Sequence, residues 1–207
     1  MGTQSEHWNE VYRSKVPEDV SWHQSEPAMS LVALDRMGLN ADASIVDVGG
    51  GASGLAAALL ARGFRDITIL DIAEPALDAA RERLGEAGHE VDWEVADVTA
   101  WHPARMFDIW HDRAVFHFLT EQWQRDAYRK TLLHALKPGG TFIIATFALD
   151  GPERCSGLPI RRYDPEMLAA EFGPAFEIAG DWREDHVTPW GSVQHFCWCA
   201  FRRTKAA

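Results

Sequence analysis

A glycine-rich turn after a short apolar segment contains the residues whose spacing most clearly predicts chemistry. Residues 45–48 (Ile-Val-Asp-Val) lead into Gly49, Gly51 and Gly54, spaced as G-x-G-x-x-G, and Asp71 lies 20 residues after Gly51. Glycine lets a ligand approach backbone that a Cβ would block. A carboxylate can accept hydrogen bonds from two vicinal hydroxyls at once. The spacing therefore predicts a site for a cofactor that contains a ribose.

Two cofactors fit this spacing. A nicotinamide dinucleotide fits the glycines together with Asp71. Asp47 lies two residues before the first glycine, where its carboxylate would repel a pyrophosphate but attract a ligand with an ammonium group and a sulfonium. S-adenosylmethionine is such a ligand. A turn that binds nothing is disfavoured, because Asp71 and Asp97 stand at the ends of the next two predicted strands.

The composition narrows the class of protein. The chain has 207 residues, of which 46% are hydrophobic and 25% charged, so we expect one globular domain. A net charge of −11 should repel a phosphate backbone, so nucleic acid is not an expected partner. No stretch approaches the roughly 18 apolar residues of a membrane span, and the N-terminus has no signal region. We expect a soluble, cytoplasmic protein with no membrane contact.

The cysteines favour a reducing compartment and no metal site. Cys155, Cys197 and Cys199 are too few, and odd in number, for a disulfide framework. His195 alternates with the last two cysteines along one predicted strand, which places all three on one face. No second ligand pair is spaced to complete a metal site. We therefore expect no metal.

Short apolar segments alternate with longer amphipathic ones, which is typical of an α/β fold. The predicted strands are 44–48, 67–71, 91–95, 107–111, 141–147, 176–182 and 193–201. The predicted helices of the core are 53–62, 75–85 and 121–136. The first five strands should be parallel, whereas the turn at 189–191 is too short for a parallel crossover and predicts an antiparallel hairpin. Residues 5–13 and 27–37 should form helices that cover the sheet as a lid.

These motifs resemble those of the class I S-adenosylmethionine-dependent methyltransferases, and the resemblance covers most of the chain. Residues 47–51 (Asp-Val-Gly-Gly-Gly) are similar to the first motif of that family. Asp71 is similar to its ribose-binding acid, and residues 96–98 (Ala-Asp-Val) to its adenine-binding segment. Residues 136–140 (Leu-Lys-Pro-Gly-Gly) resemble its turn into the fifth strand, a feature that nicotinamide enzymes lack at this distance.

The resemblance implies a Rossmann-like seven-stranded sheet of order 3-2-1-4-5-7-6, with an antiparallel C-terminal hairpin and helices on both faces. Residues 1–207 would then form a single methyltransferase domain, in which residues 1–40 are the helical lid and residues 41–207 the core. S-adenosylmethionine would bind where the strand order reverses, between the first and fourth strands.

The resemblance also assigns roles in binding the cofactor. Asp97 would accept from the adenine amino group, although a helix cap ahead of Thr99 is the alternative. Aromatic residues before and on the lid helices could stabilise the sulfonium by cation–π attraction, Trp22 more than Trp8 and Tyr12, although all three could be structural. The predicted cofactor-binding residues are Trp22, Asp47, Gly49, Gly51, Asp71, Ile72, Asp97, Val98 and Asp112.

The segment after the fourth strand should face the transferring methyl. Residues 112–114 (Asp-Arg-Ala) resemble the Asp-Arg-Gly or Asp-Lys-Gly element of thiopurine-type S-methyltransferases and of several lysine methyltransferases, with alanine in place of glycine. The predicted catalytic residues are His117, Asp112 and Arg113. The alternatives are an ion pair between Asp112 and Arg113 and a purely structural histidine; His111 is the weaker candidate for a base.

The expected function is methyl transfer to a small-molecule acceptor, with a thiol or another soft nucleophile favoured by the thiopurine-type resemblance. A protein lysine is the alternative acceptor, since an acidic surface would attract a basic segment. The alternatives from other classes are a nicotinamide-dependent oxidoreductase, disfavoured by Asp47 and residues 137–140, and a cofactor-binding protein without activity. The oligomeric state is left open.

Overall fold

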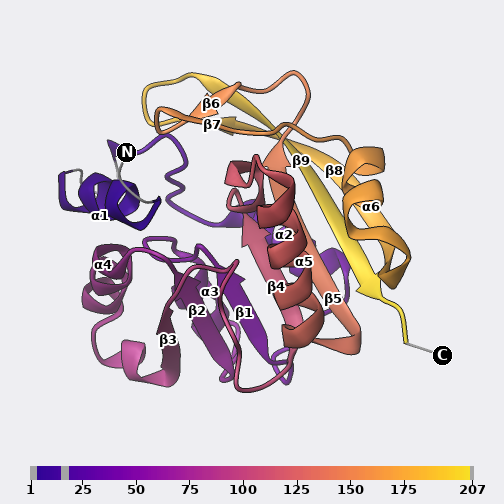
Figure 1. The fold of residues 1–207 in the computed structure, drawn as a ribbon. Helices are drawn as coiled ribbons and strands as arrows, with labels where there is room; N and C mark the ends of the chain where they lie inside the picture. Colours follow the sequence, from indigo (N-terminus) through magenta and orange to yellow (C-terminus); the bar gives the residue numbers. More distant parts are fainter. Residues whose placement is uncertain (1–3, 15–18, 206–207) are drawn as a thin grey trace.

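The computed structural model describes residues 4–14 and 19–205. Residues 1–3 and 15–18 of the predicted lid, and residues 206–207 of the predicted core, lie outside the described residues. The main sheet has seven strands in the order β3-β2-β1-β4-β5-β9-β8 (Figure 1). These strands are β1 (Ile45–Val48), β2 (Ile67–Asp71), β3 (Val91–Val95), β4 (Phe107–Arg113), β5 (Leu136–Phe147), β8 (Phe176–Val187) and β9 (Val193–Arg203). The first five are parallel, and β9 is antiparallel to both β5 and β8. The predicted sheet order and the C-terminal hairpin are confirmed.

Helices cover both faces of this sheet, as predicted. The α-helices are α1 (Gln4–Ser14), α2 (Ala28–Arg36), α3 (Leu55–Ala61), α4 (Glu74–Leu84), α5 (Gln122–Ala135) and α6 (Pro165–Phe172). Apolar residues of α5 and α6 share one buried core with the sheet. Apolar residues of α2, α3 and α4 share a second core on the opposite face. Successive strand residues alternate between the cores, Ile45 in the second and Val46 in the first, because side chains alternate along a strand.

The two N-terminal helices have different environments. Helix α2 packs on the sheet through Ala33 and Leu34, which are fully buried. Helix α1 lies beyond the sheet and next to α4 (Figure 1). Among residues 4–14 and 19–205, no helix combines the length and the apolar character that crossing a bilayer requires.

Several elements differ from the prediction, among them β5, which begins five residues earlier than predicted. Helix α6 was not predicted, although Asp164 caps it by accepting from the Met167 amide (2.8 Å) and Pro165 occupies its first turn. The two-residue strands β6 (Arg154–Cys155) and β7 (Leu158–Pro159) were also not predicted, because such short segments have no measurable alternation. Strand β8 extends five residues beyond its predicted end at 182, through charged residues that pair with β9.

Candidate active site

The glycine turn is too crowded for side chains. Gly49 has a φ of 69°, and a Cβ there would lie 2.1 Å from Cγ2 of Val115. A Cβ at Gly51 would lie 2.6 Å from Oδ2 of Asp71, which accepts a hydrogen bond from the Gly51 amide at 3.1 Å. Gly49 lines the candidate site itself, whereas Gly51 lies behind it and holds the carboxylate of Asp71.

Two adjoining cavities lie at the carboxyl ends of the parallel strands. Both are lined by Tyr12, Trp22, Val48, Gly49 and Arg113, so they are two parts of one site. The larger has an empty volume of about 840 Å³, part of it open to solvent, and it contains Asp71, Ile72, Asp97 and Val98. The smaller, with an empty volume of about 610 Å³, contains Asp47 and His111. Tertiary folding thus brings seven of the nine predicted cofactor-binding residues to one site.

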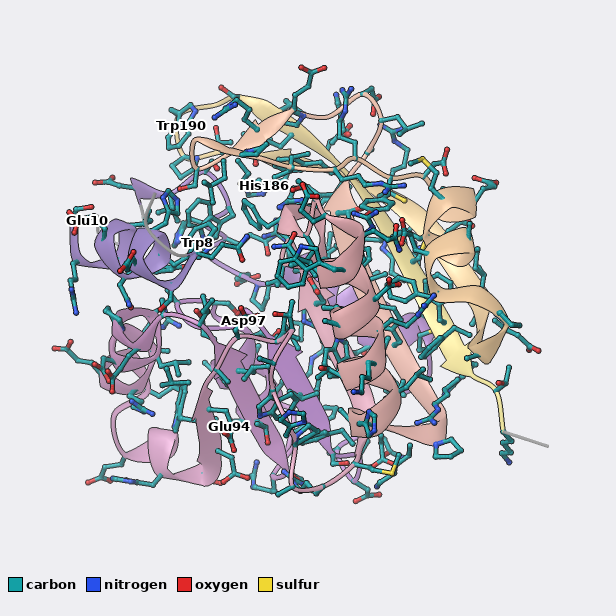
Figure 2. All side chains as sticks on the ribbon, in the orientation of Figure 1. Trp8, Glu10, Glu94, Asp97, His186 and Trp190 are labelled. Atoms are coloured by element: carbon teal, nitrogen blue, oxygen red, sulfur yellow. The ribbon has the colours of Figure 1, made fainter. Side chains whose placement is uncertain are left out.

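Asp71 and Asp97 both line the larger cavity, Asp71 as the last residue of β2 and Asp97 two residues beyond the end of β3. The oxygens of Asp71 accept from the amides of Gly51 (3.1 Å) and Ala73 (2.8 Å), which fixes its orientation. Burial raises the pKa of Asp71 to about 6. Asp97 accepts from the backbone and the hydroxyl of Thr99 through a single oxygen, Oδ1. Figure 2 shows Trp8 of α1 above Asp97, so the helix roofs this part of the site.

Asp47 is almost completely buried at the smaller cavity. Its Oδ1 lies 2.7 Å from Nδ1 of His111, the residue opposite it in the pairing of β1 with β4. Its Oδ2 has no hydrogen-bond partner among the described residues. A buried carboxylate oxygen without a partner is costly. It fits a positively charged group of a ligand at this point.

Asp112 does not line the site, although it was predicted both to bind the cofactor and to take part in catalysis. It is fully buried, with Oδ2 accepting from the Tyr128 hydroxyl (2.7 Å) and Oδ1 from the amides of Val115 (2.9 Å) and Phe116 (3.4 Å). Burial raises the pKa of Asp112 to about 6. These contacts hold the turn that brings Arg113 and Val115 to the cavity wall.

Arg113 is the cation at the centre of the site. It lines both cavities, donates from Nη1 to the carbonyl of Trp22 (3.2 Å) and lies 4.7 Å from the ring centre of Phe196. Its ion pair is with Glu184 at 3.8 Å rather than with Asp112. Glu184 already accepts from Gln24 and Trp198, and Nε and Nη2 of Arg113 have no hydrogen-bond partner among the described residues. Burial lowers the pKa of Arg113, but a guanidinium stays charged in proteins.

His117 is placed behind the cavity wall rather than on it. It is fully buried and accepts from the Phe147 amide at Nδ1 (3.3 Å), so its proton is on Nε2. Burial, with the positive charge of Arg113, lowers the pKa of His117 to about 3. The ring is therefore neutral at physiological pH.

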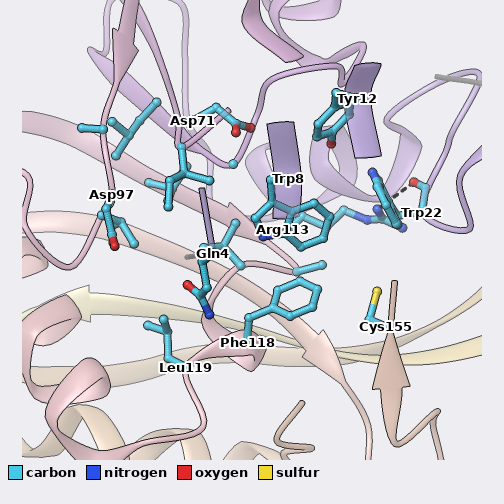
Figure 3. Close-up of a pocket in the computed structure, with 18 of the residues that line it drawn as sticks. Gln4, Trp8, Tyr12, Trp22, Asp71, Asp97, Arg113, Phe118, Leu119 and Cys155 are labelled. Atoms are coloured by element: carbon cyan, nitrogen blue, oxygen red, sulfur yellow. Dashed lines mark hydrogen bonds between the residues drawn. The ribbon is translucent and has the colours of Figure 1, made fainter. Parts of the chain in front are cut away.

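Aromatic side chains form the rest of the larger cavity. Trp8 meets Trp22 edge-on at 5.6 Å and Phe118 at 5.0 Å between ring centres. The aromatic and sulfur-containing residues of this wall are Trp8, Tyr12, Trp22, Phe118, Phe147, Cys155 and Phe196. Figure 3 shows Asp71 and Asp97 on one side of the cavity, with Trp22 and Cys155 on the other. Phe196 and Glu184 were missed from the sequence, because nothing local in the hairpin indicates that it reaches this site.

A family model matches part of the chain, and solved structures match its fold. Residues 45–140 match the model of a methyltransferase domain family. No curated protein matches the chain.

Solved structures of similar fold cover nearly the whole chain. One comes from work on the conversion of a disulfide bond into a thioacetal group during echinomycin biosynthesis; it is 23% identical, with a TM-score of 0.78 over 99% of this chain and 94% of that one. The 1,6-didemethyltoxoflavin-N1-methyltransferase of Burkholderia thailandensis, bound to 1,6-didemethyltoxoflavin and S-adenosylhomocysteine, is 21% identical, with a TM-score of 0.68 over 97% and 84%. The N-methyltransferase NodS of Bradyrhizobium japonicum, in complex with S-adenosylhomocysteine, is 15% identical, with a TM-score of 0.73 over 97% and 99%.

At these identities the structural likeness concerns the fold. The family match concerns residues 45–140, which include the glycine turn, Asp71 and Asp97. The match therefore favours S-adenosylmethionine over a nicotinamide dinucleotide as the cofactor. Residues 45–140 match a methyltransferase domain, and the sheet order is the one expected for the class I S-adenosylmethionine-dependent methyltransferases.

Proposed function

We propose that the protein transfers the methyl group of S-adenosylmethionine to a small molecule that presents a soft nucleophile, such as a thiol, in the aromatic half of the larger cavity. The observation that carries the proposal is the chemistry of that half. In the described part of the chain, its ionisable lining residues are Tyr12, Arg113 and Cys155. One is a cation, and the other two hold their protons at neutral pH.

The cofactor would occupy the remainder of the site. Asp71 would accept from the ribose hydroxyls and Asp97 from the adenine amino group, with Ile72 and Val98 against the ring. Asp47 would face the ammonium group, which accounts for its unpartnered Oδ2. When bound, S-adenosylmethionine supplies an electrophilic methyl on a sulfonium. Trp22 lines both cavities, so its ring is placed to stabilise that sulfonium.

The protonation states of the residues in the aromatic half of the larger cavity favour a nucleophile that arrives without a proton. Burial raises the pKa of Cys155 to about 12, and it raises that of Tyr12 well above its usual value. Neither side chain can therefore act as a base at neutral pH. A free thiol ionises near pH 8.5 and a lysine amine near 10.4, so a thiol reaches its reactive form far more readily. Arg113 favours the thiolate further, because it offsets the negative charge.

The remaining contribution of the protein is orientation and exclusion of water. Holding two reactants at near-attack distance is worth roughly 7 to 11 kcal/mol in model reactions. The aromatic wall, to which α1 contributes Trp8 and Tyr12, would limit the access of water to the reacting atoms. Asp112 and His117 then have a positioning role, because they hold the turn and strand that carry Arg113 and Phe147.

The structural neighbours add support for a small acceptor. One of these structures comes from work on chemistry at sulfur, the conversion of a disulfide bond into a thioacetal group. Another is named as an N1-methyltransferase of 1,6-didemethyltoxoflavin. A lysine acceptor receives less support, because its ammonium group would meet the positive charge of Arg113 and would find no base in the aromatic half of the larger cavity among the described residues.

The test has two stages. Isothermal titration calorimetry with S-adenosylmethionine, S-adenosylhomocysteine and NADH should show binding of the first two only. Transfer of labelled methyl is then measured at pH 7 to thiophenol, to aniline and to a lysine peptide, with the wild type and an Arg183→Met control at an exposed ion pair. We expect transfer to thiophenol alone. Transfer to the peptide but not to the thiol would overturn the proposed acceptor class.

A further inference from the structure

A buried chain of three hydrogen-bonding side chains leads from the smaller cavity to helix α2. Nδ1 of His111 lies 2.7 Å from Oδ1 of Asp47, and Nε2 of His111 lies 3.0 Å from Oγ of Ser30. Each of the three residues is about 2% exposed. The atoms that make these two contacts are therefore shielded from water. A hydrogen bond is stronger in such a low-dielectric environment than in water.

Each member of the chain comes from a different element. Asp47 and His111 are directly opposite in the parallel pairing of β1 and β4, so their side chains lie on the same face of the sheet. Ser30 is the third residue of α2, which packs on that face through Ala33 and Leu34. The chain therefore joins the glycine-turn strand, its neighbour and the covering helix at one point.

The same residue types form the triad of serine hydrolases, but the open position in this chain is at the acid and not at the serine. Ser30 lines the smaller cavity, but it is only 2% exposed and its Oγ lies 3.0 Å from Nε2 of His111. The acid of the chain, Asp47, lines the smaller cavity, and its Oδ2 is buried beside Gly50 without a hydrogen-bond partner among the described residues. In a hydrolase the acid serves only to orient the histidine. Here the histidine is placed to orient the acid.

We propose that His111 and Ser30 are positioning residues for the amino-acid end of the cofactor. His111 holds the Asp47 carboxylate through Oδ1, so that Oδ2 is directed to the ammonium group, and Ser30 fixes the histidine ring from α2. Such supporting hydrogen bonds are typical around groups whose orientation determines binding. This inference rests on the proposed cofactor site, and it adds that α2 determines affinity for one part of the cofactor.

The test compares two ligands that differ only at that end. S-adenosylhomocysteine carries the amino-acid group, whereas 5′-methylthioadenosine retains the adenosine and lacks the amino acid. Calorimetry is carried out with both ligands on the wild type, His111→Phe, His111→Asn and Ser30→Ala. Loss of a hydrogen bond to a charged group should weaken S-adenosylhomocysteine roughly tenfold or more in His111→Phe. The affinity for 5′-methylthioadenosine should stay within about twofold.

The other variants separate positioning from structure. An asparagine at 111 can still donate to Asp47 near the position of Nδ1, so His111→Asn should recover most of the affinity. Ser30→Ala should have the same selectivity with a smaller effect, and it remains informative if His111→Phe does not fold. His195→Phe is the matched control, because His195 makes a 2.7 Å contact with Asp185 on the exposed hairpin. It should change neither affinity.

Two results would overturn the inference while leaving the cofactor site in place. One is an equal loss of affinity for both ligands in His111→Phe and Ser30→Ala, which would indicate that the two residues have a structural role alone. The other is unchanged S-adenosylhomocysteine affinity in both folded variants. Failure of the wild type to bind S-adenosylhomocysteine would overturn the proposed cofactor site, and the inference with it.

Discussion

The two halves of the larger cavity differ in charge and in origin. The half that we propose binds adenosine contains the carboxylates of Asp71 and Asp97, which stand at or just beyond the ends of adjacent parallel strands. The half that we propose binds the acceptor combines the cation Arg113 with aromatic rings such as those of Trp8 and Phe118 (Figure 3), and it includes Phe196 from the C-terminal hairpin. The adenosine half is therefore built mainly from the ends of neighbouring strands in one sheet, whereas the acceptor half depends on how α1, the turn after β4 and the C-terminal hairpin meet.

The largest expected effect lies in the adenosine half. Asp71→Asn removes the charge that would accept from two ribose hydroxyls, and each such hydrogen bond is worth about 1.5 kcal/mol or more. We expect S-adenosylhomocysteine to bind about 100-fold more weakly by calorimetry. Asp78→Asn, at an exposed ion pair on α4, should bind normally. A loss below threefold in Asp71→Asn would place the ribose elsewhere.

The acceptor half should respond to Arg113 without a matching change in cofactor binding. Arg113→Met removes the only cation that lines this half in the described residues. Methyl transfer to thiophenol should fall roughly 30-fold at pH 7, a loss of about 2 kcal/mol. Affinity for S-adenosylhomocysteine should change less than threefold, and Arg113→Lys should retain intermediate activity. Equal losses in binding and transfer would remove the distinction between the halves.

Binding in the adenosine half should also depend on pH. Burial raises the pKa of Asp71 to about 6, above its ordinary 3.8, so protonation below pH 6 would remove the charge with which we propose it accepts from the ribose hydroxyls. S-adenosylhomocysteine affinity should be constant above pH 7 and should weaken below about pH 6. Calorimetry from pH 5 to 8 measures this, with Asp71→Asn as the control that should lose the dependence. A flat profile for the wild type would count against Asp71.

The unliganded protein should show the opposite trend in stability over the same range. A folded-state pKa above the unfolded value means that the folded protein binds the proton more tightly. The contribution of Asp71 and Asp112 to the unfolding free energy is therefore present below about pH 4 and is lost as the pH rises through about 6. Urea unfolding between pH 4 and 7 of the wild type and Asp71→Asn measures this contribution, which the variant should lose in part.

The smallest effect concerns the backbone that connects the halves. Ala114 has a φ of 71°, where alanine is strained and glycine is not. Ala114→Gly should raise the free energy of unfolding by about 0.5 kcal/mol, the relief of strain less the greater freedom of the unfolded chain. Ala57→Gly, at an exposed position within α3, should lower it by about 1 kcal/mol. A less stable Ala114→Gly protein would show that the side chain contributes packing that outweighs the strain.

Much of the fold could be predicted because its signals are local. Alternating apolar segments and a short final turn predict the parallel sheet and its terminal hairpin, and both are present. Asp71 and Asp97 could be placed together because strand ends in a parallel sheet meet at one edge. Helix α6 carried a detectable start in Asp164 and Pro165, and it was missed because only eight residues follow.

The residues alone predicted the glycine turn, the parallel core strands and the positions of the acids that end them, because each of these features depends on neighbours within one strand and turn. The order of the strands in the sheet was implied by the family resemblance. Only the tertiary structure decided what the ionisable residues after β4 do. Burial against Tyr128 removes Asp112 from the cavity, whereas Arg113 reaches Trp22 and Glu184 across more than 70 residues of chain. The bonds from His111 to Asp47 and Ser30 are of the same kind. Contacts between distant segments leave no periodic trace in the sequence, so they emerge only when the cores are packed.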